Sequence, residues 1–281
     1  MFLHYKADWI NFVRGLIASF LLFLPYYAKL PEGYEILTMA IIFPLVSDVN
    51  HILHLHTHRP FAKSGFLNFV LDIFMGISTA MTASNWRIQH KFGHHNKNRG
   101  EFCKGYDWEM EKYTILGALS YSIRTVPPIF YLPIFEAFEK GIKQNIKTPI
   151  NYRWAFIEQM MFVIFVLGLL WYQPFWTLVW LLPFYAIVLV TTRYIDYLNH
   201  FGCSDEKYKV SNNSINKNYN LLGNNFGYHT AHHLYGGAHW TELPALHEKI
   251  KDQIPAYQLK EYSWSGYVIP YHFYLSLKGK M

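Results

Sequence analysis

The sequence has little charge and almost no cysteine. Only 16% of its 281 residues are charged, whereas a typical soluble domain has roughly 25%. Uncharged residues are gathered into long runs, such as 16–24 and 174–192. A helix of ~20 apolar residues is long enough to cross a bilayer. This composition indicates an integral membrane protein and excludes a soluble enzyme, a disulfide-rich secreted module and a disordered chain.

Several other features are absent. The two cysteines, Cys103 and Cys203, are too few for a disulfide framework. We find no repeat of fixed period, no low-complexity tract and no interdomain linker, so we expect a single domain over residues 1–281. The N-terminus lacks the pattern of a cleaved signal peptide, so the first apolar segment is expected to be retained. The sequence also has neither a dinucleotide fingerprint nor a b5-type haem module.

Apolar segments predict an all-α membrane protein. They cover residues 9–28, 34–53, 66–84, 114–135, 154–172 and 174–195. We expect 9–28, 34–53, 154–172 and 174–195 to be four transmembrane helices. The other two segments are expected to be interfacial or re-entrant helices, and the Pro127-Pro128 pair is expected to interrupt the helix over 114–135. Six spans are the alternative.

The distribution of basic residues predicts the orientation of these helices. With four spans, the two connections on the far side are 29–33 and 172–174, and of the 25 Lys and Arg residues only Lys29 lies there. Cytoplasmic loops carry the excess of Lys and Arg, so the remaining polar segments are expected to form a cytoplasmic cap. Topology therefore explains the net charge of +6, and nucleic-acid binding is not expected.

Many of the fifteen histidines fall into four groups. In the first group, about 100° of rotation per residue puts His51, His54 and His58 on one helical face and His56 on the opposite side. The other groups are His90 with His94 and His95, then His200, and then His229 with His232 and His233. All four groups can meet on one side of the membrane if 66–84 and 114–135 do not cross it, in agreement with the charge distribution.

Such a set of imidazoles indicates a metal site. A single zinc ion takes three or four protein ligands, so about nine converging imidazoles suit two metal ions better than one. Imidazole binds zinc, copper, iron and nickel alike, and the ligand type does not choose between them. Because Cys103 and Cys203 are near the second and third groups, a His/Cys zinc site is an alternative.

The order of these motifs resembles the membrane fatty acid desaturase and hydroxylase superfamily over residues 45–250. The motifs are H-x3-H, H-x-x-G-H-H, a single His before Phe201-Gly202, and H-x-x-H-H. The second and third motifs look like those of membrane alkane hydroxylases, except that Asp196 and Asn199 replace an Asn and a Glu. The stretch 227–247 is similar to the tail of bacterial acyl-lipid desaturases.

This resemblance implies two iron ions held by nine ligands: His54, His58, His90, His94, His95, His200, His229, His232 and His233. Three further residues could be ligands or hold the ligands in place: His51, Asp196 and Asp107, with Glu109 as a similar candidate. By contrast, His4, His56 and His272 are expected not to be ligands, and His239 and His247 are expected to be structural.

The implied reaction is O2 activation by the iron centre and hydrogen abstraction from an unactivated C–H bond of a lipid acyl or hydrocarbon chain. A fatty acyl desaturase is favoured, and a hydroxylase (a monooxygenase) or an oxidative decarboxylase is the alternative. A zinc-binding membrane protein without redox chemistry is a further alternative. The external electrons would come from a ferredoxin, a rubredoxin or a cytochrome. Basic residues that could dock such a donor are Lys91, Lys97, Arg99, Lys104, Lys207 and Lys209.

Overall fold

The computed structural model describes residues 2–95, 114–143 and 151–261, most of which are helical. The chain forms two compact units, one made of residues 1–92 and 129–189 and the other of residues 93–128 and 190–281. The expectation of a single domain over 1–281 stays a prediction.

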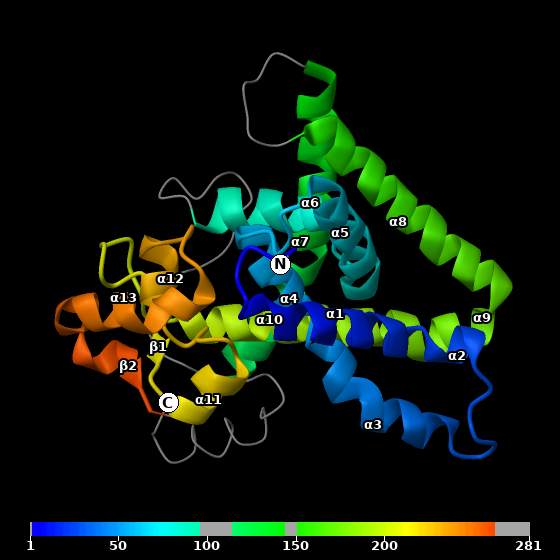
Figure 1. The fold of residues 1–281 in the computed structure, drawn as a ribbon, viewed down its shortest axis with the longest axis horizontal. Coiled ribbons are helices and arrows are strands. Elements are labelled where there is room, and N and C mark those ends of the chain that lie inside the picture. Colours follow the sequence, from blue (N-terminus) through cyan, green and yellow to red (C-terminus); the bar gives the residue numbers. More distant parts are fainter. Residues whose placement is uncertain (1, 96–113, 144–150, 262–281) are drawn as a thin grey trace. The chain divides into compact units, whose positions relative to one another are not determined.

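Helices are the main elements described in the first unit (Figure 1), together with an isolated antiparallel bridge between Leu3 and Ala62. Its elements are α1 (Asp8–Leu22), α2 (Leu24–Tyr27), α3 (Glu35–Ser47), α4 (Val49–His58), α5 (Gly65–Thr79), α6 (Ala83–Trp86), α8 (Tyr152–Tyr172), α9 (Pro174–Trp176) and the π-helix η3 (Thr177–Leu181). Three elements have residues in both units: the π-helix η1 (Arg87–His94), α7 (Ile115–Lys143) and α10 (Leu182–His200).

Among the described residues, three helical segments are long and apolar enough to cross a membrane. They are Glu35–His58, Tyr152–Tyr172 and Pro174–His200, and each overlaps one of the predicted spans. The predicted span 9–28 forms α1 and α2 instead and is not among the three. The count of four spans therefore stays a prediction.

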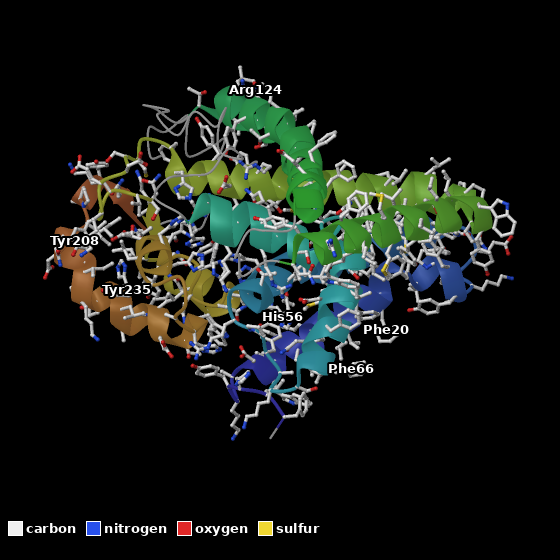
Figure 2. All side chains as sticks on the ribbon, turned by 90° about the horizontal axis from the view of Figure 1, so that it is seen from above. Phe20, His56, Phe66, Arg124, Tyr208 and Tyr235 are labelled. Atoms are coloured by element: carbon white, nitrogen blue, oxygen red, sulfur yellow. The ribbon has the colours of Figure 1, made fainter. Side chains whose placement is uncertain are left out.

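The exposed surface of the first unit is apolar where a soluble protein would be polar. Helix α1 buries Asp8, Asn11 and Ser19, whereas Trp9 and Phe20 on the same helix are exposed. Figure 2 shows Phe20 and Phe66 projecting away from the ribbon. Large exposed apolar surfaces mark contact with another apolar medium, so these helices are suited to a lipid environment.

The segment predicted at 66–84 forms a broken helix. The axis of α5 and that of Ala83–Lys91 are bent by 86°, as in a broken span or a re-entrant loop. Ala80 adopts a left-handed backbone conformation with φ of 60°, which ends α5. The side chain of Thr82 then accepts a hydrogen bond from the Asn85 N–H and caps α6. This geometry fits the expectation that the segment does not cross as one straight helix.

The predicted interruption at Pro127-Pro128 is wrong. Helix α7 runs from Ile115 to Lys143 without a break. Each proline of the pair lacks the N–H that would bond the carbonyl four residues earlier, so the bonds to Ile123 and Arg124 are missing. The φ angle of proline is compatible with a helix, and long membrane helices tolerate such losses.

The second unit combines the ends of α7 and α10 with short elements from the C-terminal part of the chain. These are β1 (Asn213–Ser214), α11 (Lys217–Leu222), α12 (His229–Leu234), α13 (Leu243–Ile250), β2 (Leu259–Lys260) and the 3-10 helices η4 (Trp240–Glu242), η5 (Lys251–Gln253) and η6 (Ala256–Gln258).

Two apolar clusters form the core of this unit. One joins Ala118 and Tyr121 of α7 to Tyr194 and Leu198 of α10. The other lies beneath α12 and consists of Ala231, Leu243, Ile250 and Ile254. Strand β1 pairs in parallel with β2, with Asn213 opposite Leu259. The C-terminal part of the unit therefore packs against α12, the helix that carries the fourth histidine group.

Candidate metal centre

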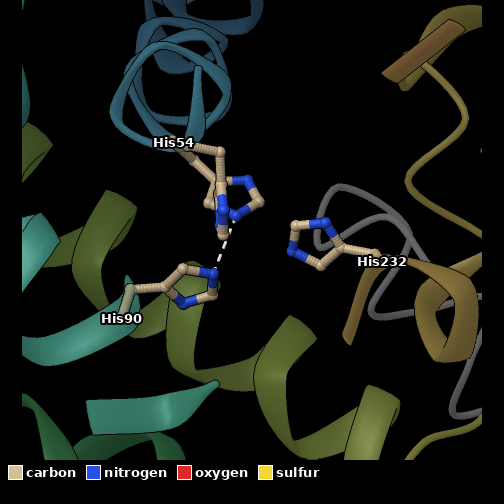
Figure 3. Close-up of side chains that lie close together, drawn as sticks. His54, His90 and His232 are labelled. Carbon is tan, nitrogen blue, oxygen red and sulfur yellow. Dashed lines mark hydrogen bonds between the residues drawn. The ribbon is translucent and has the colours of Figure 1, made fainter. Parts of the chain in front are cut away.

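The first unit gathers three imidazoles from two of the predicted groups. His54 and His58 are on α4, His90 is on η1, and all three side chains are buried. Their ligand atoms lie within 4.8 Å of one another. The Nε2 atoms of His54 and His90 face each other at 2.8 Å (Figure 3). His232, which Figure 3 also labels, belongs to the second unit.

Local structure explains why these side chains converge. The spacing of four residues puts His54 and His58 on one face of α4, and their ring centres are 4.8 Å apart. His90 belongs to a π-helical segment, a rare conformation that is frequent at functional sites. The indole of Trp86 packs beside the cluster, with ring centres 5.6 Å from His54 and 5.4 Å from His90.

The second unit gathers four imidazoles from the other groups. They are His94 at the end of η1, His200 at the end of α10, and His229 and His233 on α12. Their ligand atoms also lie within 4.8 Å of one another. Nε2 of His229 is 3.2 Å from Nε2 of His200 and 3.2 Å from Nε2 of His233.

The protonation of this second cluster suits metal binding. Nδ1 of His200 lies 2.9 Å from the carbonyl oxygen of Val210. Because a carbonyl only accepts, Nδ1 carries the proton and the lone pair is on Nε2. Metal-bound histidines commonly orient their second nitrogen in this way. Burial, followed by the neighbouring histidines, holds the pKa of His94 well below its usual value, which favours the neutral imidazole.

The distances between the imidazole nitrogens also fit a shared cation. With metal–nitrogen bonds of about 2.0–2.1 Å, two ligands at right angles lie about 3 Å apart. The separations of 2.8 and 3.2 Å in the two clusters are close to this value. Both donor sets therefore suit a metal ion that accepts imidazole ligands.

A carboxylate lies beside the second cluster, at the predicted position Asp196. Its Oδ1 is 3.8 Å from Nε2 of His94 and 3.9 Å from Nε2 of His200. Its Oδ2 lies 2.8 Å from Nη1 of Arg193 and accepts a hydrogen bond from the Tyr121 hydroxyl at 3.1 Å. Arg193 is itself buried and donates to the Thr125 hydroxyl. The carboxylate is thus held with one oxygen toward the imidazoles.

Three other predicted ligands or ligand candidates lie near the cluster of their own unit without belonging to it. They are His51 in the first unit and His95 and His232 in the second. The ring of His95 stacks on His233, with centres 4.4 Å apart, and its centre is 4.6 Å from that of His232. The ring of His51 is 6.1 Å from that of His54. Asp107, Glu109, Cys103 and His272 lie outside the described residues.

The expected non-ligands have other partners. Nδ1 of His56 accepts the Phe61 N–H, and Nε2 of His56 faces Asp72. His239 bonds to Thr241 through Nδ1, and His247 packs on Tyr228. Cys203 contributes to neither cluster, since its sulfur accepts a hydrogen bond from Gln258. Within the described part of the chain, nothing therefore supports a His/Cys zinc site.

Sequence reasoning missed two residues that lie next to the first cluster. Asp72 and Arg87 form an ion pair between α5 and η1, and Nε2 of His56 reaches the same carboxylate. The sequence offered one signal for this ion pair, which is the acidic residue Asp72 inside an apolar segment. Acidic residues are rare in such segments unless they have partners.

Comparison with known families supports the same interpretation. The family model described as fatty acid desaturase matches residues 35–265. No curated protein and no solved structure matches the chain. The matched range contains all three candidate membrane spans and every histidine of both clusters. The chain therefore belongs to the fatty acid desaturase family, a family of desaturase- and hydroxylase-type oxidases that is typically di-iron.

Proposed function

We propose that the protein is an O2-dependent di-iron oxidase that removes hydrogen from an unactivated C–H bond of a lipid acyl chain, and that it acts as a fatty acyl desaturase. The observation that carries this proposal is the pair of buried imidazole clusters in a chain of this family.

The ligands are proposed as follows. His54, His58 and His90 hold one iron ion, and His94, His200, His229 and His233 hold the other. His95 and His232 complete the nine ligands that the family resemblance implies. Asp196 is the oxygen donor of the second site, directly or through a water molecule, since its Oδ1 lies at a ligand-like distance from two imidazoles. His51 remains a further candidate beside the first site.

The bound iron ions would supply O2 activation and hydrogen abstraction from the acyl chain. The protein's own residues do the rest. The Val210 carbonyl accepts a hydrogen bond from the protonated Nδ1 of His200, so that Nε2 holds the lone pair that binds the metal. Arg193 and Tyr121 keep Asp196 aligned. The buried indole of Trp86 covers one side of the first cluster and limits the access of water there.

A lipid substrate suits the surroundings of the first site. The helices of the first unit expose large apolar side chains, including Ile164 and Leu167 on α8 and Ile41 on α3. An acyl chain can reach a site between such helices from the bilayer without passing through water. We propose that the histidine clusters lie at the cytoplasmic side, where the excess of basic residues is expected.

We propose that the electrons come from a ferredoxin, a rubredoxin or a cytochrome that docks on the cytoplasmic side. Two of the basic residues considered for docking have internal partners. Lys91 donates to the carbonyl of His58, and Lys209 pairs with Glu206 at 2.7 Å. Lys97, Arg99 and Lys104 lie outside the described residues.

The first test is metal content, measured by inductively coupled plasma mass spectrometry on detergent-purified protein. We expect about two iron ions per chain, or mixed occupancy that iron reconstitution converts to two. A single zinc ion that iron cannot replace would refute the oxidase and support the redox-silent alternative.

The second test feeds fatty acids to cells that express the protein and analyses the products. We expect a new double bond in the chain. Recovery of alcohols alone would identify a hydroxylase, which the likeness of the second and third motifs to alkane hydroxylases favours as the second candidate. A shortened terminal alkene would identify a decarboxylase.

A further inference from the structure

A buried polar network lies next to the first histidine cluster and contributes no ligand to it. Arg87 makes two hydrogen bonds to Asp72, from Nη1 to Oδ2 at 2.9 Å and from Nη2 to Oδ1 at 2.8 Å. Nε2 of His56 lies 3.3 Å from the same Oδ1. His56 is 0% exposed (Figure 2 places it among the helices), and the side chain of Asp72 is 15% exposed.

The proton of His56 is fixed by its other neighbour. The backbone N–H of Phe61 donates to Nδ1 of His56 at 3.2 Å, so Nδ1 holds the lone pair and Nε2 carries the proton. The N–H group of Nε2 therefore faces the carboxylate of Asp72. Asp72 thus contacts one neutral donor and one guanidinium, and the two-bond geometry with Arg87 is the strongest form of such a pair.

The positions of these residues connect the two helices that carry the cluster. His56 lies between His54 and His58 on α4, and Arg87 lies one turn before His90 on η1. Asp72 is on α5, which carries none of the three imidazoles. A single carboxylate on a third helix therefore contacts both ligand-bearing helices.

A second side-chain contact also connects α4 to η1. Nζ of Lys91, the residue after His90, donates to the carbonyl oxygen of His58 at 3.3 Å. The 2.8 Å separation of the His54 and His90 nitrogens requires α4 and η1 to keep a fixed spacing and rotation. No backbone hydrogen bond between these two helices is found within the described residues, so side-chain contacts of this kind must fix their spacing and rotation.

We propose that Asp72 is a positioning residue, which sets the geometry of the first metal site through His56 and Arg87. The proposal rests on the proposed function only in assuming that this cluster binds a divalent metal ion. Removing the charge of Asp72 leaves the half-buried guanidinium of Arg87 without its counter-charge, which is more disruptive than losing one neutral hydrogen bond. Mutation of residues that hold metal ligands in place typically changes metal affinity by about 10- to 100-fold.

The experiment uses the full-length protein, freed of metal and titrated with Co(II), whose absorption reports imidazole ligation. The variant is Asp72→Asn, which keeps the size of the side chain and removes its charge. The matched control is Asp48→Asn in the same unit, because Asp48 also pairs with an arginine, Arg14, but forms no ion pair with a histidine within the described residues. Melting temperatures of the metal-free proteins are measured in parallel.

We expect wild-type protein to bind two Co(II) ions and Asp72→Asn to bind one of them about 10- to 100-fold more weakly, with an altered spectrum for that ion. Asp48→Asn should match the wild type. Arg87→Lys should fall between the two, because a lysine cannot form the two-bond pair.

The proposal would be overturned if Asp72→Asn bound both ions with wild-type affinity. It would equally be overturned if both ions were weakened to the same extent together with a lower melting temperature, since that result indicates a general structural role. Wild-type protein that binds Co(II) at both clusters but never oxidises lipid would refute the proposed function alone. Wild-type protein that binds no ion at the first cluster would overturn this inference.

Discussion

The carboxylate of Glu158, within α8, accepts a hydrogen bond from the backbone N–H of Ser84 at 3.3 Å. Its other oxygen accepts the Ala83 N–H at 3.2 Å. Both N–H groups belong to the first turn of α6, where the helix itself offers no acceptor. Glu158 thus caps the second half of the broken helix, and the adjacent Gln159 bonds to Asn85 at 2.6 Å.

Replacing Glu158 should therefore weaken the fold at the break. We expect Glu158→Ala to lower the free energy of unfolding by about 1–3 kcal/mol, because two buried N–H groups lose their acceptor. Glu158→Gln keeps one acceptor oxygen and should cost less. Thermal unfolding in detergent, followed by intrinsic fluorescence, measures both. Equal losses in the two variants would contradict the capping role.

Gly227 should not tolerate a side chain. A Cβ at this position would overlap the carbonyl oxygen of Ser214 and lie 2.6 Å from Oδ1 of Asn220. Gly227 precedes His229 by two residues, so any shift of the backbone displaces an imidazole of the second cluster. We expect Gly227→Ala to reduce both the melting temperature and the metal content.

The matched control for that variant is Gly237→Ala. Among the described residues, no atom lies within 4 Å of a Cβ built at Gly237, so this substitution should leave metal content unchanged. If Gly237→Ala lost as much metal as Gly227→Ala, the loss could not be attributed to the close contacts of Gly227.

His233 and His56 should respond differently to alanine. His233→Ala removes an imidazole of the second cluster, and we expect it to abolish activity and lower the metal content of that site. His56→Ala removes no imidazole of either cluster, although it leaves Asp72 with one partner fewer. We expect His56→Ala to retain metal at the second cluster and part of the activity. Mass spectrometry for metals and product analysis compare the two, and equal loss from both variants would refute the face assignment of α4.

His247 should make stability depend on pH. Burial lowers the pKa of His247 in the folded protein, whereas in the unfolded chain the pKa is about 6.5. As the pH falls through about 6.5, the unfolded chain takes up a proton that the folded protein does not, so the free energy of unfolding decreases.

His247→Gln removes this titration. The melting temperature of metal-free wild-type protein should therefore fall more steeply between pH 7 and pH 5 than that of the variant. Parallel curves for the two proteins would show that His247 does not titrate differently in the folded and unfolded states.

The spacing of histidines in the sequence predicted which of them share a helical face. The interval between His54 and His58 predicted one helical face, and in the structure both join the first cluster while His56 does not. The intervals from His229 to His233 predicted a helix, which is α12. Helical periodicity is a local property, so it can be derived from residues a few positions apart.

Other features depend on neighbours distant in sequence. No spacing rule pairs Asp72 with Arg87 or brings Glu158 to the start of α6, because these contacts connect separate helices. The uninterrupted α7 through Pro127-Pro128 was mispredicted for a related reason. A local rule for proline counts the lost hydrogen bonds but not the stability of the long helix around them.

The second cluster has a consequence for how the protein is made. Its imidazoles extend along the chain from His94 to His233. Because synthesis starts at the N-terminus, the second site cannot exist until most of the chain has left the ribosome. We therefore expect its metal to be inserted late in biogenesis, after the hydrophobic helices have entered the bilayer. A chain truncated before α12 should be able to reach the membrane yet never acquire its full complement of metal.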